Sequence, residues 1–369
     1  QELYSQNPSL PLAPASTLKL LTSAGVLGAL DPTEQLVTKA VFAAGDPGIG
    51  TVTLVAGGDV TLAPDVGNPA AVMGHAGMGD LARAAAIQLR RDGIRQVFVA
   101  LDDTLFRGAP SFPDWEWNAG TTWGSPVAPV AILGGRAGPG FDASTFFADP
   151  ALAAAQQFAT LLQAAMADQS LDLPVGVVAK DVTRAGAVPD AKVLAEVRSA
   201  PVWQLMEYQI AYSHNGLADA LGRVAAVAAG WPGSFEGCAN GARQALEALD
   251  LDLSGLVMDD CSGLSHGSRV TSALLTAVLL AEGGPLVRGL AVGGLNGTLG
   301  HRFTEAPALG NVRAKTGTLT GVTSLAGTVQ TAGGRLLVFA VVANPGTEIW
   351  TDSARVELDH FVAGLAAIA

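Results

Sequence analysis

Near its N-terminus the sequence reads Leu12-Ala-Pro-Ala-Ser16-Thr-Leu-Lys19-Leu-Leu-Thr22. Apolar residues recur at helical spacing after Pro14, so we expect a helix that begins near Ser16. Ser16 and Lys19 are three residues apart and project from one face of that helix. A serine at a helix start gains from the positive end of the helix dipole, and a lysine made neutral by burial can accept its proton. The stretch therefore holds a candidate nucleophile with its base.

Taken alone, a Ser-x-x-Lys spacing is weak evidence for a catalytic pair, because most such pairs are solvated surface residues. Two further stretches carry lysine, serine or asparagine in short motifs. Lys315-Thr316-Gly317-Thr318 is rarer by composition, since the chain has only five lysines, and it falls where we expect a strand to start. Ser213-His214-Asn215 separates two helical patterns, where a serine and an asparagine ordinarily form a turn or a helix N-cap.

Composition limits the classes of protein that the chain can belong to. It has 369 residues, a net charge of −12, and 49% hydrophobic against 15% charged residues, which indicates a globular protein of about two domains. The acidic balance gives no electrostatic basis for binding nucleic acid or anionic membrane surfaces. No apolar run approaches the roughly 18 residues of a transmembrane segment. The chain starts at Gln1 without Met, so we expect an upstream segment, including any signal peptide, to have been removed.

Hydrophobic periodicity changes along the chain. Residues 41–43, 51–56 and 96–101 are expected to be strands, and with a helix over 78–92 they favour a small α/β unit. Further helices are expected over 150–167, 202–212, 216–229, 239–249 and 270–282, followed by a hairpin of 312–330 and 335–343 and a last helix from Asp352. Residues 106–140 form a long irregular stretch with three tryptophans, which either pack a subdomain or wall a cleft.

Other kinds of site find little support. The five histidines show no i, i+4 pairing, so a zinc hydrolase is disfavoured, and we expect neither a metal nor a cofactor. Gly263-Leu-Ser265-His-Gly267 matches a nucleophile elbow, but no buried strand precedes it, so we interpret it as a glycine-rich loop. The two cysteines, Cys238 and Cys261, are either buried thiols or a disulfide, and their number alone does not decide between these.

Together, in the order Ser-x-x-Lys, Ser-x-Asn and Lys-Thr-Gly, the three motifs match the set of penicillin-binding proteins and class A β-lactamases. The chain resembles the low-molecular-mass (class C) penicillin-binding proteins, which are D-Ala-D-Ala carboxypeptidases and endopeptidases of peptidase family S13. Supporting stretches run in order along nearly the whole chain: Gly57-Gly-Asp-Val-Thr-Leu62, Asp260-Cys-Ser-Gly-Leu-Ser265, Gly297-Thr-Leu-Gly-His-Arg302 and Lys315-Thr-Gly-Thr-Leu319.

The resemblance implies an α/β (α+β) fold of the serine β-lactamase/DD-transpeptidase type, with an antiparallel sheet flanked by helices and a smaller inserted α/β domain. Residues 1–38 and 188–369 would form the catalytic domain and 39–187 the inserted domain II, in which we expect the nested third domain of some relatives to be missing. Cys261 stands where the family has glycine. Because the family acts outside the membrane, where disulfides persist, this favours a Cys238–Cys261 bond.

The resemblance also implies roles for individual residues. Catalysis falls to Ser16, Lys19, Ser213, Asn215 and Lys315. Substrate binding falls to Thr316, Gly317 and Thr318, and we separately predict that Trp117 and Trp123 line the cleft from the inserted domain. Ser16 would be the acylated nucleophile and Lys19 its base, while Ser213 would relay a proton to the leaving amine. The backbone N–H groups of Ser16 and Thr318 would form the oxyanion hole. His214 and Val60 depart from the family's usual residues at positions away from the chemistry.

The expected function is a serine D-Ala-D-Ala carboxypeptidase, or DD-endopeptidase, that cleaves peptidoglycan stem peptides through an acyl-enzyme at Ser16. β-Lactams would acylate the same serine, and the enzyme would work outside the cytoplasm, in the periplasm or cell wall or as a secreted protein. Two alternatives are weaker. For a class A β-lactamase, the 197 positions from Ser16 to Ser213 are too many and the Glu-x-x-Leu-Asn motif is missing. A silent cell-wall binding protein would have no reason to keep nucleophile and base together.

Overall fold

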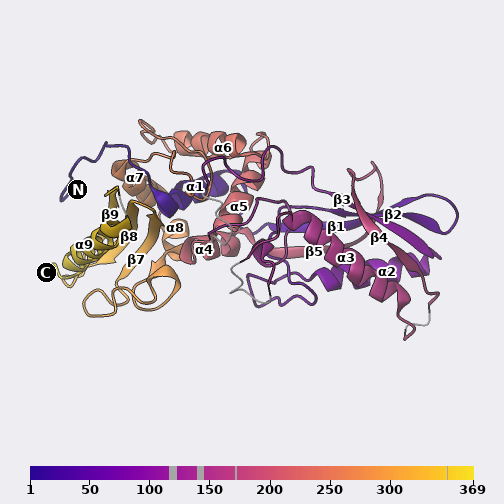
Figure 1. Cartoon of the computed structure of the whole chain (residues 1–369). Helices are drawn as coiled ribbons and strands as arrows, with labels where there is room; N and C mark the ends of the chain where they lie inside the picture. The colour runs from indigo at the N-terminus through magenta and orange to yellow at the C-terminus, as the bar shows by residue number, and fades with distance from the viewer. Residues whose placement is uncertain (116–122, 139–144, 171–172, 347) are drawn as a thin grey trace. The chain divides into compact units, whose positions relative to one another are not determined.

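The computed structural model describes residues 1–115, 123–138, 145–170, 173–346 and 348–369 (Figure 1). The chain divides into two compact units. Unit 1 comprises Gln1–Pro32, Phe112–Glu116 and Trp203–Ala369, and unit 2 comprises Thr33–Ser111 and Trp117–Val202. The division thus lies a few residues before the expected boundary at 38 and well after the one at 187. In the described residues no helix is both long and apolar enough to cross a membrane.

Unit 2 is built on a five-stranded sheet with the order β4-β3-β2-β1-β5. Its strands are β1 (Gln35–Ala44), β2 (Ile49–Val55), β3 (Gln96–Asp102), β4 (Val177–Arg184) and β5 (Lys192–Pro201). β2, β3 and β4 pair in parallel, whereas β1 pairs antiparallel with both β2 and β5. The parallel strands are linked through α2 (Met78–Arg91) and α3 (Pro150–Ala167), so the expected α/β unit is present.

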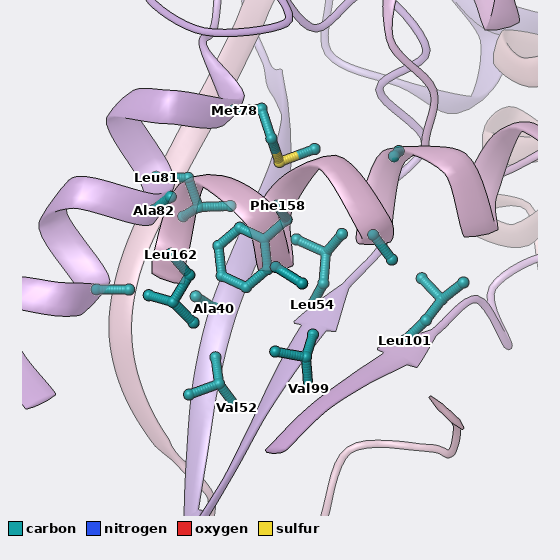
Figure 2. Close-up of a cluster of buried hydrophobic side chains, with 14 of the residues drawn as sticks. Ala40, Val52, Leu54, Met78, Leu81, Ala82, Val99, Leu101, Phe158 and Leu162 are labelled. Carbon is teal, nitrogen blue, oxygen red and sulfur yellow. The ribbon is translucent and has the colours of Figure 1, made fainter. Parts of the chain in front are cut away.

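A single hydrophobic core joins this sheet to its two helices. Leu54 and Val99 on the strands meet Leu81 on α2 and Phe158 on α3, all fully buried or nearly so (Figure 2). α3 starts sharply, because the Asp149 side chain accepts the Leu152 N–H at 3.0 Å and Pro150 occupies the first helical turn. Unit 2 therefore has the core of an independent folding unit.

Unit 1 carries a four-stranded antiparallel sheet with the order β6-β7-β8-β9. Its strands are β6 (Ala291–Val292), β7 (Val312–Leu319), β8 (Val322–Gln330) and β9 (Leu336–Ala343). Its helices are α1 (Lys19–Ala29), α4 (Val202–Ala211), α5 (Asn215–Ala228), α6 (Phe235–Ala248), α7 (Ser272–Glu282), α8 (Gly284–Gly289) and α9 (Glu348–Ala366). Short 3-10 turns are η1 (Ala15–Leu18), η2 (Leu133–Gly135, in unit 2) and η3 (Gly297–Leu299).

Helices cover both faces of this sheet. Leu325 and Val329 of β8 pack in one core with Val362 of α9, while Ala326, on the opposite face, packs with α1 and α7. The C-terminal helix α9 lies along the strands in Figure 1. An antiparallel sheet flanked by helices, together with a second α/β unit, confirms the expected fold class.

The structure differs from the expected elements in three places. Residues 312–330 form two strands rather than one, because a tight turn at Thr320-Gly321 separates β7 from β8. β4 was not expected at all. β5, which lies after the predicted domain boundary at 187, pairs with β1 and therefore belongs to the sheet of unit 2.

Candidate active site

Ser16 lies in η1, the 3-10 turn that leads directly into α1. Three donors converge on the carbonyl of Pro14 just before it: Thr17 N at 3.3 Å, Thr17 Oγ1 at 2.7 Å and Ser324 Oγ at 2.6 Å. Ala15 is held at a φ of 46°, a left-handed conformation that costs a non-glycine residue energy. The turn that presents the Ser16 hydroxyl is therefore held by hydrogen bonds from η1 itself and from β8.

Lys19 is fully buried and makes three polar contacts. Its Nζ lies 3.1 Å from Ser16 Oγ, 2.6 Å from Asn215 Oδ1 and 2.6 Å from the carbonyl oxygen of Ser262. Burial lowers the pKa of Lys19 to about 8, against the opposing charges of Asp219 and Asp260. Neutral Lys19 would use its two N–H bonds on the two carbonyl oxygens, which leaves its lone pair facing the Ser16 hydroxyl.

Asn215 reaches Lys19 from the first residue of α5, after a turn formed by Ser213 and His214. Ser213 has a φ of 56°, so the chain reverses there between α4 and α5. His214 Nδ1 accepts the Leu217 N–H at 3.1 Å and caps α5. The residue between Ser213 and Asn215 therefore serves the helix start, which agrees with the expectation that it faces away from the chemistry.

β7 passes next to η1 with Lys315 and Gly317 on the same face of the sheet. A Cβ at Gly317 would lie 2.2 Å from Ser324 Oγ, 2.6 Å from Pro14 O and 3.0 Å from Ser16 N, so only glycine permits this approach. Lys315 is fully buried and donates from Nζ to Thr316 O at 2.6 Å. Burial, and then the positive charges of Lys19 and Arg302, hold the pKa of Lys315 well below its usual range.

The outer edge of β7 is free where the motif lies. β6 pairs with β7 only at Ala314 and Arg313, and among the described residues no strand covers the edge from Lys315 to Leu319. Thr318 is exposed, and Thr316 Oγ1 donates to Thr298 Oγ1 of η3 at 2.9 Å. A free strand edge beside a half-buried serine can receive the main chain of an extended peptide.

The segment 260–263 closes the site from behind. Gly263, at a φ of +79°, sits so close that a Cβ there would lie 2.0 Å from Ala15 O. Cys261 is bonded to Cys238 of α6 in a disulfide, with a Cα–Cα separation of 6.6 Å, and its carbonyl accepts the Thr22 hydroxyl of α1 at 2.7 Å. The disulfide thus anchors the backbone that presents Ser262 O to Lys19.

The tryptophans have separate positions. Trp115 is buried in unit 1, where it stacks edge-on against Phe235 and donates from Nε1 to Asp260 Oδ2 at 2.8 Å. Trp123 belongs to unit 2 and is 64% exposed, and Trp117 lies outside the described residues. The structure therefore groups Ser16, Lys19 and Asn215, while a cleft role for Trp117 and Trp123 stays a prediction.

Two functional candidates had no role assigned to them from the sequence. Asp219 and Asp260 are buried beneath Lys19 and act on it through their charge. Asp219 lies four residues after Asn215, hence on the same face of α5, and that spacing is the one signal in the sequence that could have found it. Across the described residues, no three His, Cys, Asp or Glu side chains are grouped so that they could hold a metal ion.

Comparison with known proteins agrees with this geometry. The D-Ala-D-Ala carboxypeptidase 3 (S13) family matches the chain over residues 1–170 and 145–364. A carboxypeptidase of Mycobacterium tuberculosis is 36% identical, with 93% of this chain and 74% of the relative covered. The carboxypeptidase DacB of Mycolicibacterium smegmatis is 35% identical with the same coverage. Penicillin binding protein 4 of Haemophilus influenzae shares the fold at a TM-score of 0.78, with 20% identity, over 100% of this chain and 94% of that one.

The family match spans nearly the whole chain, and both curated relatives exceed 30% identity over most of their length. The resemblance carried by the three motifs is thereby confirmed. The chain belongs to the D-Ala-D-Ala carboxypeptidase 3 (S13) family, and its activity is that of a serine D-Ala-D-Ala carboxypeptidase.

Proposed function

We propose that this enzyme releases the terminal D-Ala of peptidoglycan stem peptides through an acyl-enzyme on Ser16, with Lys19 as the base. One observation carries the assignment: Lys19 Nζ lies 3.1 Å from Ser16 Oγ while Asn215 Oδ1 and Ser262 O take up two of its N–H bonds. With a pKa of about 8, roughly one tenth of Lys19 is neutral at pH 7. That fraction is enough for a general base near its working pH.

In the acylation step Ser16 Oγ attacks the carbonyl carbon between the two D-Ala residues while its proton passes to Lys19 Nζ. The developing oxyanion would lie between the N–H groups of Ser16 and Thr318, which the close approach of β7 to η1 brings near each other. The C–N bond then breaks, and Ser213 relays a proton from Lys19 to the leaving amine. Water releases the acyl group from Ser16 in a second cycle of the same kind.

The substrate's terminal carboxylate would bind to the hydroxyls of Thr316 and Thr318, next to Lys315. Burial lowers the pKa of Lys315. An arriving carboxylate acts in the opposite direction, because a nearby negative charge favours the ammonium form. Gly317 keeps the strand close, and Asn215 holds both Lys19 and the substrate amide. Binding of the anionic substrate would thus favour the ammonium form of Lys315, whose positive charge attracts the carboxylate.

β-Lactams would acylate Ser16 in the same way and remain bound, because the amine expelled from the opened ring stays tethered to the acyl group instead of leaving the site. The name of the Haemophilus protein that shares the fold, a penicillin binding protein, supports this expectation. Peptidoglycan lies outside the cytoplasmic membrane, and the Cys238–Cys261 bond suits an oxidising compartment, so we place the activity there.

Mass spectrometry of the intact protein after exposure to benzylpenicillin tests the assignment. We expect one covalent adduct on the wild type, located at Ser16, and none on Ser16→Ala. The exposed Ser5 provides a matched control, since Ser5→Ala should be acylated at the wild-type rate. An adduct on Ser16→Ala, or none on the wild type, contradicts the proposal.

Product analysis separates the two peptidase activities that the family description leaves open. Release of D-Ala from a linear stem peptide, compared with cleavage of a cross-linked dimer, gives the preference of carboxypeptidase over endopeptidase. Trp117→Ala and Trp123→Ala test the predicted cleft: a contribution to binding raises KM for the stem peptide, whereas unchanged kinetics of both variants remove these residues from the site.

A further inference from the structure

Three ionisable side chains are buried together behind the Ser16 hydroxyl. Lys19 comes from α1, Asp219 from α5, and Asp260 from the segment between α6 and α7, and none of them is more than 1% exposed. The proposed chemistry uses only Lys19. Two ionised carboxyls in the protein interior cost folding free energy unless their charges are compensated. The protonation state of each carboxyl therefore decides the electrostatic field at Lys19.

Asp260 is built to be ionised. Its carboxylate accepts the N–H of Gly263 at 2.7 Å, the N–H of Ser265 at 2.8 Å and Trp115 Nε1 at 2.8 Å. A carboxylate that accepts several N–H bonds is favoured in its charged form, because a proton would compete with those donors. Asp260 therefore supplies a fixed negative charge, even though burial raises its pKa.

Asp219 is in the opposite situation. Its Oδ1 accepts the Cys261 N–H at 2.9 Å, while its buried Oδ2 finds no partner at good hydrogen-bond geometry among the described residues, although the nearby Ser262 hydroxyl opposes the rise of its pKa. Burial, and then the neighbouring charge of Asp260, raise the pKa of Asp219 to about 7. Of two buried carboxyls that share one region, the one with the bare oxygen is the one that holds a proton.

We propose that Asp219 is a positioning residue for Lys19, whose protonation sets how readily Lys19 gives up its own proton. Protonated Asp219 leaves one negative charge, that of Asp260, opposite Lys19, which allows the amine to be neutral. Ionised Asp219 adds a second negative charge and holds Lys19 as an ammonium. The inference rests on the proposed role of Lys19 as the base, and it assigns to Asp219 no contact with substrate.

Other charges around Lys19 act more weakly. Lys315 of β7 is fully buried and disfavours the ammonium form of Lys19, and Arg223 on α5 lies close enough to Asp219 to feel its charge. The other helices packed against α1, which are α6, α7 and α8, carry charged residues that all keep contact with solvent, namely Glu236, Arg243, Glu247, Glu282 and Arg288. Solvent screens those groups, so the carboxyl pair dominates.

Asp219→Asn locks the neutral form of this side chain with little change of shape. We expect the titration midpoint of Lys19, measured by NMR on protein with ¹³Cε-labelled lysine, to fall by about one pH unit. Five lysines make the spectrum tractable, and Lys19→Arg assigns the signal. Asp259→Asn, the same substitution in the residue next to Asp260, is the matched control and should leave the midpoint unchanged. An unchanged or higher midpoint in Asp219→Asn overturns the proposal.

In the same variant the low-pH limb of the benzylpenicillin acylation rate should move toward lower pH by the same amount. The rate at high pH should be retained. Failure of Ser16 acylation in the wild type would refute the proposed function, yet the NMR shift would still stand or fall independently. Should Asp219→Asn not fold, ¹³C-carboxyl NMR of the wild type with sequence-specific assignment decides: the carboxyl of Asp219 should titrate at about 7. If Asp219 titrates at about 4, the proposal is wrong.

Discussion

Lys19 sets the pH dependence of the enzyme. Its pKa is lowered by burial to about 8, and only the neutral amine can take the Ser16 proton. The neutral fraction falls about tenfold for each unit below that value. We therefore expect the benzylpenicillin acylation rate to rise about tenfold from pH 6 to pH 7 and to level off above pH 8. Stopped-flow measurement over this range checks the slope, and a flat profile would exclude Lys19 as the base.

Asn215 and His214 are neighbours with different duties, which makes them a matched pair. Asn215→Ala removes the acceptor 2.6 Å from Lys19 Nζ, so acylation should slow about 10- to 100-fold. His214→Ala removes the cap of α5, which should cost about 1 kcal/mol of unfolding free energy and leave acylation nearly unchanged. Equal effects of both substitutions on the acylation rate would show that Asn215 acts only through the helix.

Residue type and local spacing made Ser16, Lys19 and Lys315 candidates, and the match of three motifs in order to a known set gave them roles. Lys19 follows Ser16 by one helical turn, so their proximity is built into the sequence. The contact of Lys19 with Ser262 O spans 243 residues and involves a backbone carbonyl, which leaves no trace in the pattern of side chains. Asp260 stood within a quoted motif, but its role depends on Trp115, 145 positions away. Such pairs exist only once the fold is made.

Among the elements, β7 depends on one glycine for its distance from η1. Gly317→Ala places a Cβ 2.6 Å from Pro14 O and 3.0 Å from Ser16 N, so strand and turn must separate. We expect a loss of about 1–3 kcal/mol in unfolding free energy and a fall of more than about tenfold in acylation, because the oxyanion site widens. Urea unfolding and stopped-flow acylation measure the two effects.

Gly364, inside α9, is the control for that substitution. A Cβ there meets nothing within 4 Å, so Gly364→Ala should gain up to about 1 kcal/mol and acylate normally. If Gly317→Ala is destabilised yet acylates at the wild-type rate, the close approach of β7 serves packing rather than the oxyanion site.

The Cys238–Cys261 bond ties α6 to the segment that carries Ser262. It closes a loop of 23 positions, so its removal should cost about 3 kcal/mol. We expect the double variant Cys238→Ala/Cys261→Ala to unfold at lower urea concentration by that amount, and reductant to reproduce the loss in the wild type. Reductant should not affect the double variant. A urea midpoint of the wild type that is unchanged by reductant would contradict a disulfide in the native protein.

Elements with strong periodicity were predicted well and those without it were not. The apolar α3 was placed over 150–167, the range it occupies. β5 reads Lys192-Val-Leu-Ala-Glu-Val-Arg-Ser, with charged residues in an edge strand, and such a pattern is also typical of a loop. β7 and β8 were predicted as one strand, because the turn at Thr320-Gly321 has the same kinds of residue as the strands on either side of it.

At the scale of the whole molecule, chain order hides which parts fold together. Unit 1 collects three separate segments, one of which, Phe112–Glu116, lies between two stretches of unit 2. Trp115 makes this excursion stable, because its indole is buried against Phe235 and bonded to Asp260. A predicted boundary can mark where an insertion starts and ends, but a short return of this kind depends on contacts of single side chains.

Each unit has its own hydrophobic core, so ligand stabilisation should be confined to one of them. The cluster with Leu81 and Phe158 lies wholly in unit 2, whereas the clusters with Leu275 and Val362 lie in unit 1. An acyl group on Ser16 makes non-covalent contacts with its site only while unit 1 is folded, which favours the folded state of that unit. Hydrogen exchange followed by mass spectrometry should show slower exchange in α1, α5 and β7 after benzylpenicillin treatment.

Peptides from α2 and α3 should exchange at unchanged rates in the same samples, because these helices pack in a hydrophobic core separate from those of unit 1. Ser16→Ala exposed to benzylpenicillin provides the baseline, since it carries no adduct and should show no change in either unit. If protection in α2 and α3 rises together with that in α1, the two units open as one cooperative body, and the separate cores do not act as separate folding units.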